Sequence, residues 1–226
     1  KKNVVNPEFL NYLFQSDIIR NQIRKKAQGI TRFGLTQPKW KSIEIPIPPL
    51  EIQEKIVKIL DKLTKLTAEL TAEHALRKKQ CQYYRDLLLD FDNLNNPFAK
   101  GVDVEWKTLG EIVPLQRGKR LIKSQLNENG QFAVFQNSLQ PLGYYNEANC
   151  RAYMTFIISA GAAGEIGFSH KSFWAADDCY YFDCPKDFLN DRFLYYFLMT
   201  QKHKLTSQVR KASVPRLGRG IIEKIN

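Results

Sequence analysis

Three groups of residues have types that could do chemistry, but none has the spacing that such chemistry requires. Gly161, Gly164 and Gly167 are spaced G-x-x-G-x-x-G, whereas a dinucleotide-binding fingerprint needs G-x-G-x-x-G. Asp177 and Asp178 form a tight acidic pair without a lysine at nuclease spacing. The four cysteines and three histidines make no C-x-x-C or H-x-x-x-H pair, which favours buried thiols over a metal site. The sequence therefore predicts neither an active site nor a metal site on this chain.

Recognition of DNA bases needs polar side chains beside turns, and four loops of the sequence supply them. Arg and Lys can donate to guanine or bind phosphate, Gln and Asn suit adenine, and Tyr can pack on a sugar or a base. For each residue, a solvated surface position or a phosphate contact is the alternative. The predicted DNA contacts are, loop by loop, Arg117, Lys119, Arg120 and Lys123; Gln136, Asn137 and Tyr144; His170 and Lys171; and Arg210, Lys211, Arg216 and Arg219.

The charge of the chain points to the same kind of partner. The 226 residues include 34 Lys+Arg and 23 Asp+Glu, a net charge of +11, which favours a polyanion such as nucleic acid. With 43% hydrophobic residues the chain can form buried cores, so wholesale disorder is excluded. It has no apolar run long enough to span a membrane and no signal-peptide pattern, so we expect a soluble, cytoplasmic protein.

The excess positive charge lies at the two ends of the chain. Residues 1–50 contain nine basic and three acidic side chains, residues 51–96 contain eight of each, and residues 97–226 contain seventeen and twelve. The net charges are therefore +6, 0 and +5. This distribution predicts a neutral spacer between two basic regions.

The spacer has the pattern of a long helix. Pro48 and Pro49 precede it, and no proline or glycine occurs from Glu51 to Asn96, so one helix of about 60 Å is expected. Apolar residues recur at alternating spacings of three and four, which is the seam of a coiled coil. The seam consists of Ile52, Ile56, Ile59, Leu63, Leu66, Leu70, Tyr84, Leu87 and Phe91, with three polar positions between Leu70 and Tyr84.

A helix with one apolar stripe needs a partner helix, and the sequence contains no second one. The partner must come from another chain or from further sequence; the alternative is a bundle helix inside one compact domain. The Asn-, Pro- and Gly-containing stretch DFDNLNNPFAKG ends the helical period, and a new domain is expected near Val104.

The region after Val104 reads as a mixture of strands and helix. The segments EIVPL, FAVFQ, MTFIIS and CYYFD are predicted strands of a small sheet. Residues 189–207 are predicted to form a helix whose aromatic stripe packs inward. That stripe contains Phe193, Tyr196 and Phe197, with Met199 also facing inward; the alternative for the aromatic rings is stacking on DNA bases. The fold class is therefore α+β, with a small mixed or antiparallel sheet, packed helices and a long coiled-coil-type connector helix.

The two ends of the chain resemble each other. NPEFLNYLFQS, from Asn6, aligns with NDRFLYYFLMT, from Asn190, and QIRKKA resembles QVRKA. Farther on, RFG at Arg32 aligns with RLG at Arg216, which makes Arg32 a further predicted DNA contact. A period near 184 residues indicates a duplicated domain. Because the chain starts and stops inside the repeat units, we expect a fragment of a longer protein, or a processed or permuted form.

The order of these segments resembles the specificity subunit of type I restriction-modification enzymes. The resemblance covers nearly the whole chain and rests on the repeat, on IPIPPLEIQEKIVKILDKL at the start of the long helix, and on VEWKTLGEIVPLQRGKRL after it. It implies two target-recognition domains, each reading half of a split DNA site. Two long antiparallel helices separate them, set the spacing and bind the methyltransferase subunits.

The resemblance also implies where the domains lie and which functions belong to partner subunits. Residues 1–47 would be the end of a first target-recognition domain, 48–95 the spacer helix, 96–103 a linker and 104–226 a nearly complete second domain. The expected partners are double-stranded DNA, methyltransferase subunits, restriction subunits and a second copy through the long helix. S-adenosylmethionine, Mg and ATP would belong to partner subunits, with no cofactor on this chain. The alternatives are the reader portion of a fused methyltransferase polypeptide, or a dimerisation scaffold without specific DNA binding.

Overall fold

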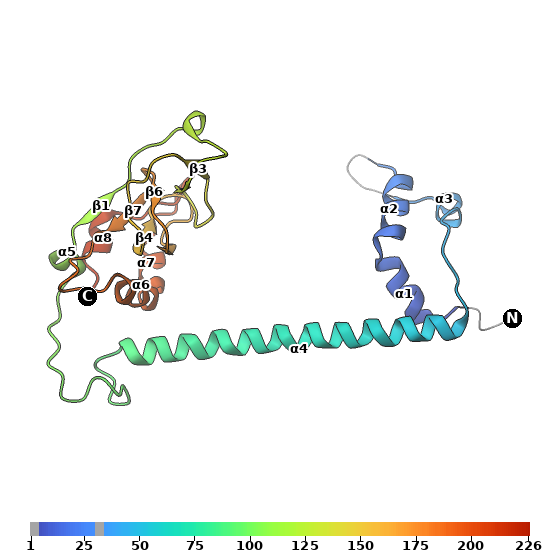
Figure 1. Ribbon diagram of the computed structural model, residues 1–226, viewed down its shortest axis with the longest axis horizontal. Coiled ribbons are helices and arrows are strands. Elements are labelled where there is room, and N and C mark those ends of the chain that lie inside the picture. The colour runs from blue at the N-terminus through green and yellow to red at the C-terminus, as the bar shows by residue number, and fades with distance from the viewer. Residues whose placement is uncertain (1–4, 30–33) are drawn as a thin grey trace. The chain divides into compact units, whose positions relative to one another are not determined.

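The computed structural model describes residues 5–29 and 34–226. The chain divides into two compact units, residues 1–80 and 81–226, and the helix α4 runs from the first into the second (Figure 1). Among the described residues, no helix is long and apolar enough to cross a membrane. The domain boundaries proposed from the sequence at residues 47, 95 and 103 stay predictions.

The first unit is helical. It contains α1 (Pro7–Gln15), α2 (Asp17–Lys26), α3 (Gln37–Lys41) and the first part of α4 (Leu50–Leu89). Asn6 starts α1 because its side-chain oxygen accepts hydrogen bonds from the backbone N–H groups of the first turn. Pro at the beginning of α1 and α3 fits the first helical turn, where no N–H donor is required.

Polar contacts join α1 and its N-cap residue Asn6 to the first part of α4. The Gln53 side chain is fully buried; its Oε1 accepts from the Asn6 backbone N–H at 2.7 Å, and its Nε2 donates to the Pro48 carbonyl at 2.7 Å. Farther along, the Tyr12 hydroxyl donates to Asp61 Oδ1 at 2.7 Å. Val57 is buried in the same region of the helix. Because both the oxygen and the nitrogen of the Gln53 amide are hydrogen-bonded, they fix where α4 begins relative to α1.

The predicted long helix of about 60 Å is confirmed: α4 has 40 residues. It ends at Leu89, directly before the stretch DFDNLNNPFAKG that is predicted to end the helical period. The buried Asn96 side chain explains this, because its Nδ2 donates to the carbonyls of Leu88 and Asp90 at 3.2 and 3.0 Å and so satisfies the end of the helix. Phe91 therefore lies beyond α4, in the turn that follows it.

The predicted apolar seam of α4 lies on the surface. Side chains at its start and middle are 42% to 60% exposed, and Tyr84 is 50% exposed. Ile56, Leu87 and Phe91 are partly buried. A bundle helix within one compact domain would bury such a stripe, so this alternative is wrong for α4. The exposed seam residues are Ile52, Ile59, Leu63, Leu66 and Leu70.

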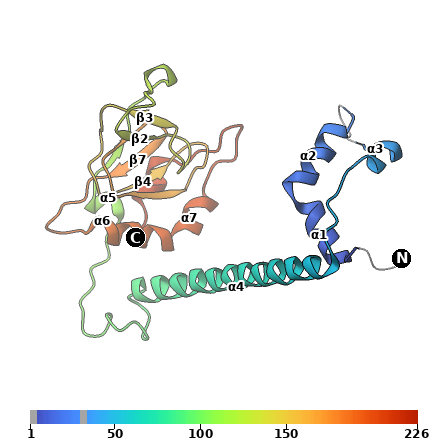
Figure 2. The ribbon, with the colours of Figure 1, turned by 45° about the vertical axis from the view of Figure 1, so that its right-hand side comes forward.

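The second unit contains two small sheets (Figures 1 and 2). One has four antiparallel strands in the order β1-β7-β4-β5, and the other has three in the order β3-β2-β6, with β2 and β6 parallel. The mixed and antiparallel sheet predicted from the sequence is confirmed. The strands are β1 (Leu115–Arg117), β2 (Phe132–Phe135), β3 (Gly143–Tyr145), β4 (Met154–Ile158), β5 (Ile166–Ser169), β6 (Phe173–Ala175) and β7 (Cys179–Phe182).

Strand β4 lies between two hydrophobic cores, and all five of its residues are buried. Ile157 belongs to the core under the helices, while Met154, Phe156 and Ile158 belong to the core shared with β6. Successive side chains of a strand point to opposite faces. The alternation on β4 therefore joins the helical layer to the second sheet.

The helical layer of the second unit consists of α5 (Leu109–Ile112), α6 (Asp191–Thr200), α7 (Lys202–Ser207) and α8 (Arg219–Glu223). A short 3-10 helix, Lys123–Gln125, lies between β1 and β2. Figures 1 and 2 show α6 and α7 on one side of β4 and the strands β2 and β3 on the other.

Two sequence predictions for this region are wrong in detail. EIVPL does not form one strand: its first residues complete α5, because Thr108 donates to Glu111 from both its backbone and its hydroxyl, which also lowers the pKa of Glu111. The predicted helix over residues 189–207 is two helices that meet at Gln201.

The inward face of α6 also differs from the prediction. Leu194 and Leu198 are the buried residues of this helix, whereas Phe193 and Tyr196 are each 41% exposed. Phe197 and Met199 are partly buried against the core, as predicted. Leu194 and Leu198 are four residues apart and so lie on the one face of α6 that packs against β4 and β5.

The duplication seen in the sequence has a counterpart in the structure. Asn6 and Asn190, which align, both accept N-terminal hydrogen bonds of their helices, α1 and α6. Each pair of helices is followed by a loop closed by an antiparallel bridge, Gln28 with Gly34 and Arg210 with Arg216. A short helix follows each loop, α3 in one unit and α8 in the other. Arg32 lies outside the described residues.

Three of the four cysteines are buried, as the sequence predicts, but Cys81 on α4 is exposed. Burial raises the pKa of the Cys150 and Cys184 thiols to about 12 and raises the pKa of Cys179 as well. A buried thiol with a raised pKa is a poor nucleophile at neutral pH because little thiolate is present.

We therefore expect one fast thiol reaction in the folded chain. An aromatic disulfide reagent at about pH 8 should titrate Cys81 rapidly and the other three thiols only in denaturant. A Cys81→Ser chain is the matched control and should lose the fast phase. Rapid reaction of more than one thiol in the native protein would contradict the buried positions.

Candidate nucleic-acid interface

Strand register brings several loop ends of the second unit to one edge. Arg117, the last residue of β1, pairs with Tyr180, and Ile158 at the end of β4 pairs with Cys179 at the start of β7. The segments after β1 and β4 and before β7 therefore all leave the four-stranded sheet at the same end of its strands. We call this end of the sheet the loop edge, and the other end of the strands is the opposite edge. The opposite edge contains Met154 and Ser169, which pair with each other.

The first predicted loop is closely packed at the loop edge. The Gly118 N–H donates to the Cys179 carbonyl at 2.9 Å, and the Lys119 N–H donates to the Ala175 carbonyl at 3.0 Å. A Cβ atom at Gly118 would overlap the backbone of Ala175 and Ala176. The loop is therefore fixed by its backbone, which leaves the exposed side chains of Arg117, Lys119 and Arg120 at the surface.

The second predicted loop lies beside the turn that follows β4. The Asn137 carbonyl accepts from the Ala162 N–H at 2.9 Å, and the Cys179 thiol donates to the Gln136 carbonyl at 3.2 Å. Gly161, with φ of +81°, allows this close approach. The Asn137 side chain is exposed and that of Gln136 is partly buried, so both amides lie next to the loop edge.

The fourth predicted loop reaches the same edge. Arg216 forms antiparallel bridges with Arg210 and with Ala160, and the Gly161 N–H donates to the Pro215 carbonyl at 3.1 Å. Leu217 is buried and anchors the loop in the core. Three of the four predicted loops therefore lie at the loop edge, although they are far apart in the sequence. The second and fourth loops bond directly to the turn after β4.

The remaining predicted contacts lie elsewhere. His170 and Lys171 follow Ser169, so they are at the edge opposite to the loop edge; His170 packs there against Tyr153 and Phe168 with ring centroids 5.8 and 5.2 Å apart. Tyr144 lies on β3 of the second sheet. The DNA contacts proposed for these residues stay predictions.

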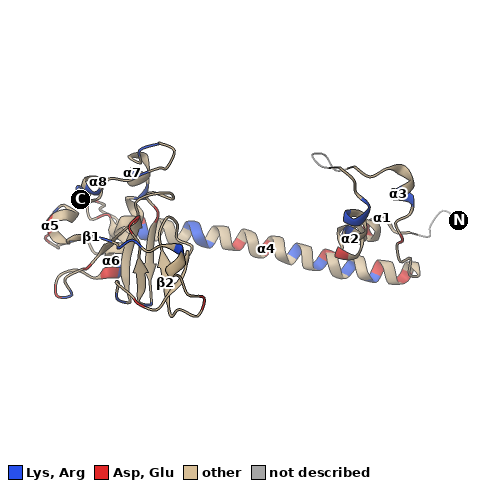
Figure 3. Cartoon of the chain, turned by 90° about the horizontal axis from the view of Figure 1, so that it is seen from above, with Lys and Arg blue, Asp and Glu red and all other residues tan. Residues whose placement is uncertain are grey.

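Three further basic residues show different surroundings. Lys123 is exposed on the 3-10 helix, and Lys211 is exposed in the fourth loop. Arg219 begins α8 and its Nε lies 2.6 Å from Glu223, so part of its charge is compensated. Figure 3 shows Lys and Arg on the segments around α7 and α8.

The glycine and aspartate motifs have structural roles at the loop edge. Gly161 and Gly164 both adopt positive φ in the turn between β4 and β5, where the Gly164 N–H donates to the Ile158 carbonyl at 2.9 Å. The carbonyls of Asp177 and Asp178 accept hydrogen bonds from Arg117 and Ser159. No cluster of three metal-ligating side chains occurs within residues 5–29 and 34–226.

Ser159, Tyr180 and Gln208 were not predicted as site residues, yet they lie with Arg117, Arg210 and Arg216 around one pocket. Their positions depend on the pairing of β1 with β7 and on the docking of the fourth loop onto the end of β4. No local pattern in the sequence contains this information.

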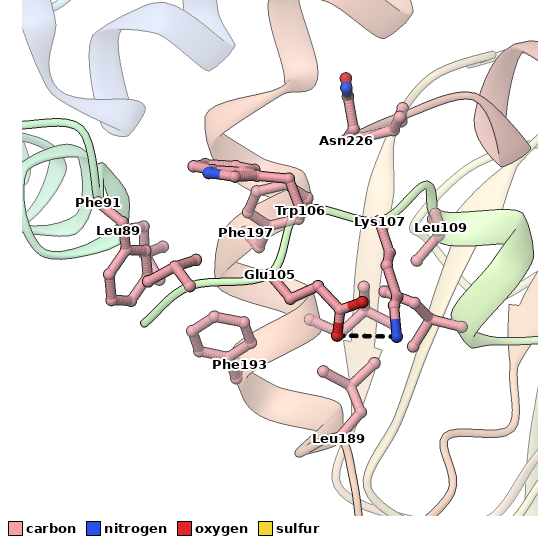
Figure 4. Close-up of a pocket in the computed structure, with 14 residues that line it drawn as sticks. Leu89, Phe91, Glu105, Trp106, Lys107, Leu109, Leu189, Phe193, Phe197 and Asn226 are labelled. Atoms are coloured by element: carbon pink, nitrogen blue, oxygen red, sulfur yellow. Dashed lines mark ion pairs between the residues drawn. The ribbon is translucent and has the colours of Figure 1, made fainter. Parts of the chain in front are cut away.

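A different, apolar pocket of about 140 Å³ lies between the end of α4 and the helix α6 (Figure 4). Leu89 and Phe91 face Phe193 and Phe197 of α6, and Trp106 lies beside them. Phe193, predicted to be a core residue, instead lines this pocket. The pocket contains none of the predicted DNA contacts, so we interpret it as the place where the chain leaving α4 packs on α6.

The family model described as the type I restriction modification DNA specificity domain matches residues 1–77 and 101–226. A putative type I specificity subunit of Mycoplasma pneumoniae, S.MpnORF615P, is 30% identical over 188 residues, which is 81% of this chain and 73% of that protein. The EcoR124I/EcoR124II specificity subunit of Escherichia coli is 50% identical over 112 residues, 46% of this chain and 24% of that protein.

Solved structures show the same fold. A chain from a structure on complex assembly and conformational transition of the type I R-M system has a TM-score of 0.58 at 21% identity and covers 100% of this chain. The S subunit from M. genitalium has a TM-score of 0.52 at 16% identity and covers 59% of it. This chain spans 59% and 35% of the lengths of those two chains. The resemblance noted in the sequence is thus confirmed: the chain belongs to the type I restriction-modification DNA specificity family, whose relatives are named as specificity subunits and not as catalytic ones.

Proposed function

We propose that this chain reads a DNA sequence and directs separate methyltransferase and restriction subunits to a bipartite site. The observation that carries the proposal is the convergence of three loops with predicted base or phosphate contacts at the loop edge. They are fixed by backbone hydrogen bonds, so their side chains can vary without loss of the scaffold. We place this function in the cytoplasm.

The basic side chains would supply affinity, and the amides would supply part of the specificity. Phosphate contacts by Lys and Arg act on all sequences and weaken with salt, whereas Gln136 and Asn137 can recognise adenine in the major groove. The chain would bind no cofactor. S-adenosylmethionine, Mg and ATP would serve the partner subunits.

Helix α4 would set the distance between two recognition regions and bind partners along its surface. Basic and acidic residues alternate along it (Figure 3), while its apolar seam is exposed. Burying such a seam against a second helix is strongly favourable. A second copy of this chain is one source of that helix, and this exposed seam is the observation that favours self-association.

Selection from a randomised duplex pool tests the reading function. The purified chain, with and without a methyltransferase subunit of such a system, should retain duplexes enriched in a short motif, single or duplicated in inverted orientation. Sequencing of the retained pool measures this. A pool without enrichment, retained by salt-sensitive binding alone, would contradict sequence recognition; no retention in about 100 mM salt would favour a scaffold.

Substitutions on the seam test self-association. Leu63→Lys with Leu66→Lys should weaken any dimer at least about tenfold, since each buried leucine contributes roughly 1.5–3 kcal/mol. Sedimentation equilibrium measures the change. Leu76→Lys replaces another exposed leucine of α4 outside the seam and should have little effect. If the unmodified chain is monomeric at tens of micromolar, the second helix must come from other sequence.

Substitution of Gly118 tests whether the first loop depends on close backbone packing. Gly118→Ala should destabilise the second unit by roughly 1–3 kcal/mol, because the added methyl overlaps two backbone carbonyls. It should also lower affinity for the selected duplex. Thermal unfolding and a binding titration measure both effects. Gly220→Ala is the matched control, since nothing lies within 4 Å of its added Cβ; equal stabilities of the two variants would contradict the packing.

A further inference from the structure

A pocket of about 440 Å³ at the loop edge is lined by three arginines and no acidic side chain. Two of the arginines come from the fourth predicted loop and one from the end of β1. Polar groups of three further residues line it with them. The arginines are Arg117, Arg210 and Arg216, and the other polar residues are Ser159, Tyr180 and Gln208.

Arg117 is oriented by its backbone neighbour. Its Nε donates to the Asp177 carbonyl at 2.9 Å, and within the described part of the chain no acceptor pairs with its two terminal nitrogens. The guanidinium is planar, so a bond at Nε restricts where the terminal N–H groups can point. One side of this cation is therefore fixed, and the other is available to a ligand.

Backbone hydrogen bonds hold the segment that contains Arg210 and Arg216 in place. The Arg210 N–H donates to the Arg216 carbonyl at 2.9 Å, and the reverse bond measures 3.2 Å. Directly after them, the Leu217 N–H donates to the Ser159 carbonyl at 2.8 Å, and the Leu217 side chain is buried. The backbone of this segment is therefore ordered before any ligand binds, which reduces the entropic cost of binding.

The charges of this pocket are not compensated within the described residues. Neither Arg117 nor Arg210 nor Arg216 has an ion pair there. Asp177 and Asp178 precede β7 nearby, but neither lines the pocket. Three cations around one concave surface repel one another, and an anion placed between them relieves that repulsion. Arginine forks fit phosphate oxygens in bidentate geometry.

We propose that Arg117, Arg210 and Arg216 form a clamp for one phosphate of the DNA backbone. The inference rests on the DNA-binding function proposed above and assigns different roles to residues that the sequence could not separate. The clamp fixes the register of the duplex on the loop edge. Gln136 and Asn137, across the turn at Gly161 and Ala162, then read the bases beside that phosphate.

Arginine variants test the clamp by comparing two duplexes, one with the selected motif and one with the motif scrambled. Arg216→Ala and Arg117→Ala should weaken binding of both duplexes by the same factor, roughly tenfold or more for a charged hydrogen bond. The slope of log K against log salt should fall by about one for each phosphate that a variant no longer binds. Arg216→Lys keeps the charge without the fork and should weaken binding less than Arg216→Ala does.

Two controls accompany these titrations. Lys186→Ala removes one exposed charge after the far end of β7 and should change neither affinity nor slope beyond a small factor. Thermal unfolding of every variant verifies that the fold is intact, which is expected because the arginine side chains are exposed. Gln136→Ala and Asn137→Ala should lower affinity for the motif duplex alone.

Single methylphosphonate substitutions identify the clamped phosphate. Neutralising one backbone position at a time in the motif duplex should reveal a position that weakens binding of the unmodified chain but not of Arg216→Ala. Inorganic phosphate at millimolar concentration should compete weakly for the pocket; competition as strong as that of the duplex would indicate a site for free phosphate instead.

The outcomes separate the clamp from the general function. If the chain selects a motif but Arg216→Ala and Arg117→Ala bind both duplexes as tightly as the unmodified chain, the clamp is wrong and the reading function stands. If the variants bind only the motif duplex more weakly, these arginines read bases and the clamp is also wrong. If the unmodified chain selects no motif and binds no DNA, both proposals fail.

Discussion

The recognition fold depends on the burial of β4 from both sides. Phe156 and Ile158 pack toward the second sheet and Ile157 packs toward α6 and α7, so one short strand joins two hydrophobic cores. Its hydrogen-bonding edges are occupied by β5 and β7. A strand paired on both edges and buried on both faces has little freedom to shift its register. The turn that follows β4 is therefore a fixed point of the second unit: the second and fourth loops attach to it by backbone hydrogen bonds, and the first loop attaches in the same way to Cys179 and Ala175.

Because the loops are attached by backbone groups, the side chains that would contact DNA contribute little to the stability of the fold. The bonds that position the loops come from backbone groups of residues such as Lys119, Asn137 and Arg216, and the side chains of these residues remain exposed. Buried backbone groups must be paired, whereas an exposed side chain can be exchanged at little cost to stability. The core under the helices consists mainly of buried aliphatic residues. The buried thiols of the unit have raised pKa values mainly because burial disfavours the thiolate.

Helix α4 is specified mainly by polar side chains at its two ends and not by burial in a hydrophobic core. Its beginning is specified by Gln53, whose buried amide pairs with groups on both sides, and its end by Asn96, whose side chain satisfies two carbonyls at the end of the helix. Between these ends most of the helix is exposed, and the seam residues Ile52, Ile59, Leu63, Leu66 and Leu70 lie on the surface. Polar side chains thus fix the two ends of the helix, while five apolar side chains of its seam stay exposed.

The sequence by itself determined the α+β class, the long helix with its seam, the duplication and the family, because periodicity, proline placement and repeated motifs are local signals. It also identified Arg117, Asn137 and Arg216 as exposed residues beside turns. Only the tertiary structure decided that these three lie at one edge of the sheet while His170 and Lys171 lie at the other, since this follows from antiparallel register between distant strands. The same holds for Tyr180 and Ser159 in the arginine pocket, and for Phe193, whose aromatic spacing indicated a core position. Long-range pairing and packing are not encoded in any single window of sequence, and they placed these residues.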